Sequence, residues 1–180
     1  VGATTLSVDD PALTVRDPEG VPDPRQPRRI VLSRTTVPSP GARVFAGDGN
    51  VTLVIDEMQV GEAEVRLSST GARVLGYRAS DGLSAALRAI ADDGVDDLLV
   101  EPGPTLLSAL WVERLIDELV VLTAGGMAGT APVLYHGPAD GTARGLVPVM
   151  RAVEAGVVED DAVTVWRPHA ISARPTSEGR

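Results

Sequence analysis

The chain of 180 residues contains no cysteine and no lysine, because all 16 of its basic residues are arginine. The missing cysteines exclude disulfides, thiol nucleophiles and cysteine-based metal sites. The missing lysines exclude Schiff-base chemistry and a P-loop lysine. Histidine occurs only twice, as His136 and His169. With so few acid–base groups, difficult chemistry would more naturally come from a bound cofactor.

Positive charge is also in short supply, since the net charge is −9 and the isoelectric point is near 4.6. This balance argues against nucleic acid or an anionic membrane as the main partner, although a local arginine pocket for a small phosphate remains compatible with it. The sequence has no apolar run of membrane-spanning length and no signal-peptide pattern. The absence of cysteine also fits a cytosolic protein, so we expect a cytoplasmic location.

Apolar patterning predicts an α/β fold with a mixed, mostly parallel sheet. The clearest helix is 80–94, because Leu83, Leu87 and Ile90 recur at helical spacing and Gly94 ends the pattern. Further expected elements are strands at 1–6, 28–33, 42–47, 51–56, 72–77, 96–101 and 117–125, an extended or mixed element at 62–69, a helix at 104–113, and a C-terminal antiparallel hairpin of 145–156 and 162–168. The β-α-β-α-β alternation over 72–124 indicates parallel strands covered by helices, and residues 168–180 are expected to form a disordered tail.

The stretch "LLVEPGPTLL" places Glu101 at the end of an apolar strand, directly before a helix that starts at Pro104. Amides of a first helical turn and the helix dipole favour a phosphate, and ligands of α/β sheets bind beyond the carboxyl ends of the strands. A rigid Pro-Gly-Pro turn with Glu101 paired to an arginine explains the same residues equally well.

The stretch "ATTLSVDDPALTVR" carries hydroxyls, carboxylates and one arginine, Arg16. Thr4 and Thr5 can donate hydrogen bonds, Asp9 and Asp10 can accept them from a ribose hydroxyl or an amide, and Arg16 can clamp a phosphate. Spacing alone favours an ordinary turn with a solvated arginine. The loop "TAGGMAGTAP" at 123–132 either approaches a ligand closely or only turns, and no cluster has metal-ligand spacing.

Four motifs in this order resemble the reductase domain of riboflavin biosynthesis: "VGATTLSVDDPALTVR", "RRIVLS", "LLVEPGPTLLSAL" and "LIDELVVLTAG". The resemblance covers residues 1–167, which we expect to form one domain. It implies a dihydrofolate-reductase-like fold, a homodimer, and the NADPH-dependent reduction of the ribosyl group of a pyrimidine ribosylamine 5′-phosphate.

The resemblance also implies roles for individual residues. Leu13, Arg16 and Glu101 would bind the substrate, with Arg16 on its 5′-phosphate and Glu101 near the reacting sugar as the catalytic-site carboxylate. The expected cofactor-binding residues are Thr5, Asp9, Arg34, Gly103, Pro104, Thr105, Leu106, Leu107, Ser108 and Ala109. The role of Arg34 does not come from the resemblance, because the family often has serine or aspartate near this position; we expect Arg34 to face the 2′-phosphate of NADPH instead.

Three features depart from the family pattern. Pro102 replaces a glycine or alanine and so removes an amide donor. The loop after "DELVVLTA" differs from the usual Pro-x-Leu-Leu-Gly. A Ser-Leu-Asp-Gly strand, a lysine and a helix of the family would lie upstream of Val1, so we expect either a fragment or a strand supplied from elsewhere.

Two other functions remain open on these residues. One is a reductase of the same fold with a different substrate, since one fold hosts many functions. The other is a catalytically inactive nucleotide-binding remnant. The sequence does not distinguish a deaminated from a diamino pyrimidine, nor NADPH from NADH.

Overall fold

The computed structural model describes residues 1–47, 50–126 and 149–169. The chain divides into two compact units, Val1–Ala109 and Leu110–Arg180, each of which is described by itself. The elements of the first unit are α1 (Ala3–Asp9), β1 (Arg29–Leu32), the short 3-10 helix η1 (Arg43–Phe45), β2 (Val51–Asp56), η2 (Glu57–Gln59), α2 (Val60–Leu67), β3 (Arg73–Tyr77), η3 (Ala79–Asp81) and α3 (Leu83–Asp92). Helix α4 (Pro104–Val112) crosses the boundary, and the second unit holds β4 (Leu119–Thr123), β5 (Met150–Val158) and β6 (Asp161–Pro168).

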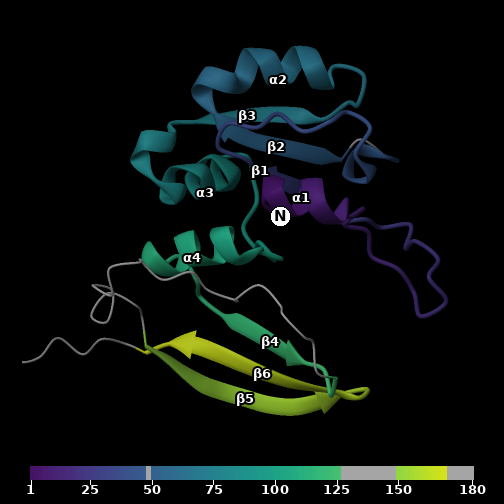
Figure 1. Cartoon of the computed structure of the whole chain (residues 1–180), viewed down its shortest axis with the longest axis vertical. Helices are drawn as coiled ribbons and strands as arrows, with labels where there is room; N and C mark the ends of the chain where they lie inside the picture. Colours follow the sequence, from purple (N-terminus) through teal and green to yellow (C-terminus); the bar gives the residue numbers. More distant parts are fainter. Residues whose placement is uncertain (48–49, 127–148, 170–180) are drawn as a thin grey trace, which may run out of the picture. The chain divides into compact units, whose positions relative to one another are not determined.

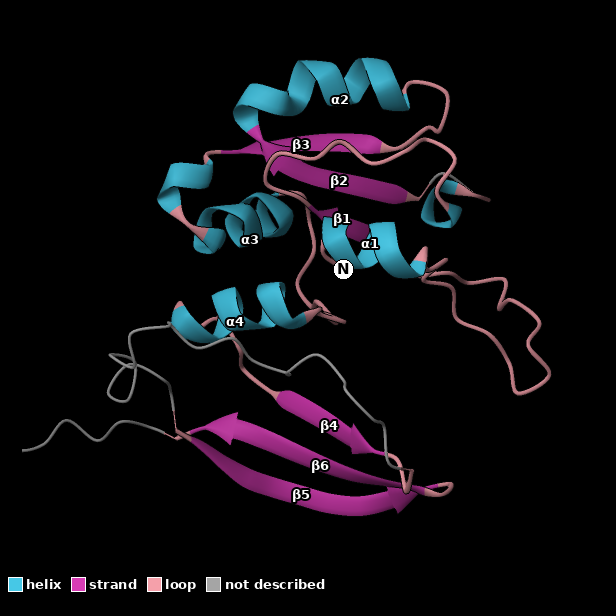
Figure 2. Cartoon of the chain, in the orientation of Figure 1, coloured by secondary structure: helices cyan, strands magenta, loops and turns pink. Residues whose placement is uncertain are grey.

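The first unit is built on a parallel sheet with the order β1-β2-β3 (Figures 1 and 2). One face of the sheet presents Val31, Leu53 and Ile55 to α1 and α2, whose buried contributions are Leu6, Ala63 and Leu67. The other face presents Ile30, Val54 and Tyr77 to Ala86 and Ile90 of α3. Because successive strand residues point to opposite faces, these short apolar strands bury both faces between helices. The expected parallel sheet with flanking helices is thus confirmed for this unit.

The sequence pattern predicted a strand at residues 1–6, and this prediction is wrong. Only Val1 and Gly2 are extended, and they run parallel to β1: the Leu32 amide donates to the Val1 carbonyl at 2.8 Å, and Gly2 bridges Leu32. Helix α1 begins at Ala3 and ends at Asp9, and the next residue, Asp10, has a left-handed φ of 42°. The β-branched Thr4 and Thr5 suggested a strand, but burial of Leu6 against the core stabilises a helix here.

The expected strand at 42–47 and the expected extended or mixed element at 62–69 are both largely helical. Residues 43–45 form η1, which buries Val44 and Phe45, and residues 60–67 form α2. The helical stripe of α2 consists of Val60, Ala63 and Leu67, and its smallest member, Ala63, gave little periodic signal.

The expected strand at 96–101 is also absent, since these residues form no ladder with the described part of the chain. Leu98 is 40% exposed and Leu99 is 86% exposed, so the apolar centre is not covered on both faces. Strands β1, β2 and β3, helix α3 and helix α4 all lie close to their predicted positions.

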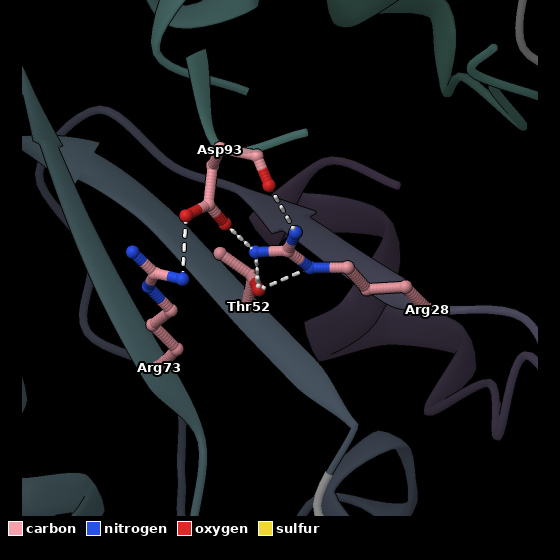
Figure 3. A network of polar contacts seen from close by, with 4 residues as sticks. All are labelled: Arg28, Thr52, Arg73 and Asp93. Carbon is pink, nitrogen blue, oxygen red and sulfur yellow. Dashed lines mark hydrogen bonds and ion pairs between the residues drawn. The ribbon is translucent and has the colours of Figure 1, made fainter. Parts of the chain in front are cut away.

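The amino ends of the strands are joined to the end of α3 by an ion-pair network (Figure 3). Asp93 follows α3, and its carboxylate pairs with both Arg28 and Arg73. Arg28 also donates to the Thr52 hydroxyl at 2.9 and 2.8 Å and to the Asp93 carbonyl at 3.1 Å. The Asp93 side chain is only 7% exposed, and a carboxylate buried to this degree needs partners of opposite charge. Arg28 and Arg73 supply them.

The second unit contains an antiparallel sheet with the order β4-β6-β5. The predicted C-terminal hairpin is confirmed: β5 and β6 pair from Val158 opposite Asp161 to Met150 opposite Pro168, with Glu159 at a φ of 54° in the turn. Strand β4 pairs antiparallel with β6, which corrects the expectation that 117–125 continues the parallel sheet. The start of the expected tail is ordered, since Pro168 ends β6 and the His169 amide donates to the Val149 carbonyl at 2.7 Å. Residues 170–180, most of the 123–132 loop and His136 lie outside the described residues.

Candidate functional site

The start of α4 packs against α1 through two glycines. A Cβ atom on Gly103 would lie 2.7 Å from the hydroxyl oxygen of Thr5, and one on Gly2 would lie 3.7 Å from Leu106. Because Gly2 is bridged to Leu32, the last residue of β1, this joint lies at the carboxyl edge of the parallel sheet. That edge is where open α/β sheets bind ligands, and it contains several of the predicted site residues.

The first turn of α4 offers two backbone amides at this joint. The first helical hydrogen bond runs from the Leu107 amide to the Gly103 carbonyl at 3.0 Å, and Pro104 has no N–H. The amides of Thr105 and Leu106 therefore lie outside the helix's own hydrogen-bond ladder. The exposed Thr105 hydroxyl sits beside them. Together with the helix dipole, these groups can hold an anionic oxygen.

The other side chains of the predicted cofactor segment, residues 103–109, are poorly suited to bind a ligand. Leu107 is 3% exposed, and the Ser108 hydroxyl donates to the Pro104 carbonyl at 2.6 Å. Ala109 is half-buried and carries only a methyl group. The segment can thus bind a ligand mainly by its backbone and by Thr105.

Glu101 is exposed and lies close to the start of the chain. Its carboxylate lies near enough to the Val1 nitrogen to affect it electrostatically. Val1 leads directly into Gly2 and α1, so Glu101 belongs to the same joint as Thr5. Pro102 follows it without an amide donor.

Arg34 marks the same edge at the end of β1. It is exposed, and its carbonyl accepts a hydrogen bond from the Asp56 amide at 3.3 Å. The Asp56 carboxylate accepts from the amides of Met58 at 3.0 Å and Ala79 at 2.9 Å. These two hydrogen bonds, with a smaller effect of Arg34, lower the pKa of Asp56 from its ordinary value of 3.8. Asp56 thus organises the loops after β2 and β3, while the Arg34 guanidinium faces solvent.

The "DDPALTVR" loop is held in a special conformation. Leu13 has a φ of 52°, a left-handed value that is uncommon for a leucine, while its side chain packs against the core. Asp10 anchors the start of the loop by accepting the Arg43 amide at 2.8 Å. Strained backbone of this kind recurs at ligand sites. Asp9, which was assigned to the cofactor, is exposed at the end of α1.

Arg16 lies on a small hairpin that projects beyond α1 (Figure 1). Its guanidinium donates to the Thr14 hydroxyl at 3.1 Å and to the Gly20 carbonyl at 3.0 Å. The structure gives it no contact with Thr5 or Glu101, so the predicted residues form two groups: those at the joint of α1 and α4, and those on the hairpin.

Asp10 was expected to accept hydrogen bonds from a ligand, whereas Gln26 had no signal in the sequence. Asp10 fixes the loop to η1, and Gln26 binds the backbone of the hairpin. Both contacts join residues far apart in the sequence, and a glutamine in a proline-rich loop suggests nothing by itself. Among the described residues, no group of three or more histidine, cysteine or acidic side chains could hold a metal ion. The helices in the same part of the chain are all too short or too polar to span a membrane.

Comparison with known proteins relates these features to one family. A sequence model of the RibD C-terminal domain matches residues 1–162. The riboflavin biosynthesis protein RibD of Chlamydia muridarum is 37% identical over 126 residues, which are 67% of this chain and 33% of the relative. RibD of Mycobacterium tuberculosis H37Rv is 31% identical over 138 residues, or 77% of this chain and 31% of the relative.

A shorter relative carries a reductase name. The 2,5-diamino-6-ribosylamino-4(3H)-pyrimidinone 5′-phosphate reductase of Archaeoglobus fulgidus is 35% identical over 127 residues, which are 66% of this chain and 57% of that protein. The chain therefore spans about a third of the RibD relatives and somewhat more than half of the archaeal protein.

Solved structures agree on the fold. RibD of Acinetobacter baumannii superposes with a TM-score of 0.70 at 23% identity, covering 93% of this chain and 46% of that one. The Thermotoga maritima deaminase/reductase gives a TM-score of 0.68 at 24% identity, covering 93% and 44%. These likenesses confirm the expected α/β fold class. From the family match over 1–162 and the relatives above 30% identity, we conclude that the chain belongs to the RibD C-terminal domain family.

Proposed function

We propose that this protein is the NADPH-dependent reductase of riboflavin biosynthesis, which converts the ribosyl group of a pyrimidine ribosylamine 5′-phosphate to a ribityl chain. Membership of the RibD C-terminal domain family and the reductase name of the archaeal relative support the reaction class. The observation that carries the proposal is the contact of Thr5 with Gly103. This close approach brings the Thr5 hydroxyl next to the two amides that lie outside the helix ladder, at one edge of a parallel sheet.

The residues at this edge fit a dinucleotide phosphate. The amides of Thr105 and Leu106 point out of the first turn of α4, and a glycine at 103 lets α1 approach that turn closely. Thr5 would add a hydroxyl, Asp9 a carboxylate for a ribose, and the exposed Arg34 a charge for the 2′-phosphate that distinguishes NADPH from NADH. When bound, the cofactor supplies the hydride for the sugar carbon.

Three residues would position the substrate. Glu101 can accept hydrogen bonds from the sugar hydroxyls near the reacting carbon, and the left-handed Leu13 can present its backbone to the ligand. Arg16 would bind the 5′-phosphate. The work of these residues is to hold the sugar in a reactive orientation, which is a main protein contribution in cofactor-dependent reactions. We further propose that the protein is cytoplasmic and forms a homodimer. Sedimentation of the purified protein would test the oligomeric state.

Cofactor binding is the direct test. NADPH fluorescence should shift on titration with the protein, and NADH should bind more weakly. Thr105→Ala removes only the hydroxyl, whereas Thr105→Pro also removes an amide of the first turn. We expect Thr105→Pro to weaken NADPH binding further than Thr105→Ala, with thermal unfolding as the check that both fold. Absence of binding at millimolar NADPH would exclude the reductase.

A further inference from the structure

The hairpin that carries Arg16 is a two-stranded ribbon with a tight tip. The Asp17 amide donates to the Val21 carbonyl at 2.9 Å, and the Asp23 amide donates to the Val15 carbonyl at 2.9 Å. At the tip, the Gly20 amide donates to the Asp17 carbonyl at 2.9 Å, with Gly20 at a φ of 82°. A ribbon this short is not stable by itself in water, so something must hold it from outside.

Gln26 provides that support, because its side-chain amide makes the hydrogen bonds that the backbone of a neighbouring strand would make. Its Oε1 accepts from the Val15 amide at 2.9 Å, and its Nε2 donates to the Val15 carbonyl at 3.0 Å and also to the Asp23 carbonyl. A side-chain amide carries the same donor and acceptor as a peptide group, so it can satisfy both backbone groups of one strand residue. Gln26 itself is half-buried, whereas Val15 is 49% exposed.

The clamped residue is the immediate neighbour of Arg16. Fixing both backbone groups of Val15 sets the direction in which the next side chain leaves the strand. The Arg16 guanidinium is then held by two neutral oxygens, the Thr14 hydroxyl and the Gly20 carbonyl. A phosphate makes stronger, charge-assisted hydrogen bonds to a guanidinium than neutral oxygens do. Arg16 is therefore held in place, and a phosphate can still replace the two neutral oxygens as the partner of its guanidinium.

We propose that Gln26 is a positioning residue for substrate binding, which orients Arg16 by clamping the backbone of Val15. The inference rests on the proposed function of Arg16 as the ligand of the substrate 5′-phosphate. Gln26 does not touch the substrate; it acts through the hairpin.

The experiment is a double-mutant cycle between the two residues. Gln26→Ala removes the clamp, and Gln26→Glu replaces its donor by an oxygen that faces two carbonyls. We expect Gln26→Ala to raise KM for the phosphorylated substrate about tenfold, and Gln26→Glu to raise it further, with kcat and NADPH affinity little changed. In the Arg16→Ala background, Gln26→Ala should add nothing to KM. Gln59→Ala, a half-buried glutamine of η2, is the matched control and should leave KM unchanged.

A second readout separates positioning from general stability. Calorimetric binding of ribose 5-phosphate should weaken in Gln26→Ala, while binding of ribose should not, and amide exchange at Val15 and Asp23 should accelerate. Equal losses on the wild-type and Arg16→Ala backgrounds would overturn the proposal, and so would an unchanged KM in Gln26→Ala when Arg16→Ala raises it. If Arg16→Ala itself changes nothing, the phosphate role of Arg16 fails, and the positioning role fails with it.

Discussion

A Cβ atom on Gly103 would lie 2.7 Å from the hydroxyl oxygen of Thr5, closer than real Cβ atoms approach any neighbour. A larger residue at 103 would therefore force the Thr5 side chain to move from its place against the turn before α4. The same contact brings the Thr5 hydroxyl to the first turn of α4, so packing and the candidate cofactor site depend on one pair of residues.

Gly103→Ala should destabilise the protein by about 1–3 kcal/mol, because the added methyl forces Thr5 to move. Thr5→Ala removes the atom that it meets, so the double variant should recover most of that loss in urea denaturation. Gly61→Ala is the control: it lies in α2 with open space around it, and it should stabilise by about 0.5–1 kcal/mol. A double variant no more stable than Gly103→Ala would show that the Thr5 contact is not the cause.

Arg16→Ala should raise the substrate KM by about 10- to 100-fold, because charge-assisted hydrogen bonds to a phosphate are lost. NADPH affinity should stay nearly unchanged. Steady-state kinetics and a fluorescence titration of NADPH measure the two effects separately. Arg25→Ala changes another exposed arginine of the same loop and serves as the control. Equal losses of substrate and NADPH binding would mean that Arg16 is structural or belongs to the cofactor site.

Asp93→Ala should cost about 2–3 kcal/mol, because it leaves Arg28, which is 25% exposed, without its carboxylate. Arg73→Ala should cost less than about 1 kcal/mol, since Arg73 is 62% exposed and water screens its pair. Urea denaturation of the two variants measures this order. A larger loss for Arg73→Ala would show that the network in Figure 3 is not centred on the Arg28 pair.

Asp56 should contribute stability that depends on pH in the acid range. Hydrogen bonds from Met58 and Ala79 lower its pKa below the ordinary 3.8, so the folded state favours the carboxylate. The contribution is fully present above the ordinary pKa and is lost as the pH falls through the folded pKa. We expect Asp56→Ala to lower Tm at pH 7, and the difference from wild type to shrink below pH about 4.

The control for Asp56 is Glu64→Ala, which removes an exposed carboxylate of α2. Its Tm difference from wild type should be small at pH 7. A Tm difference for Asp56→Ala that stays constant down to pH about 2 would contradict the assignment of the hydrogen bonds to the charged form.

Elements with strong local patterns were predictable from the sequence. The continuous apolar runs of β1 and β2, the helical spacing of α3 and the hairpin of β5 and β6 agree with the structure. The misread segments have weak or misleading local signals. The stripe of α2 depends on Ala63, and the run at 98–100 looks like a buried strand although Leu99 is 86% exposed. A strand is stabilised by its neighbours, and a local pattern does not reveal whether they are present.

The sequence by itself determined the family through its motifs, excluded cysteine and lysine chemistry, and pointed to Glu101 and the start of α4 as a place for a ligand. Only the tertiary structure decided that Thr5 meets Gly103, that Asp56 ties the loops after β2 and β3 together, and that Gln26 clamps Val15. Each of these contacts joins residues from separate segments. Their distances follow from how the helices and loops pack on the sheet, which local periodicity does not encode.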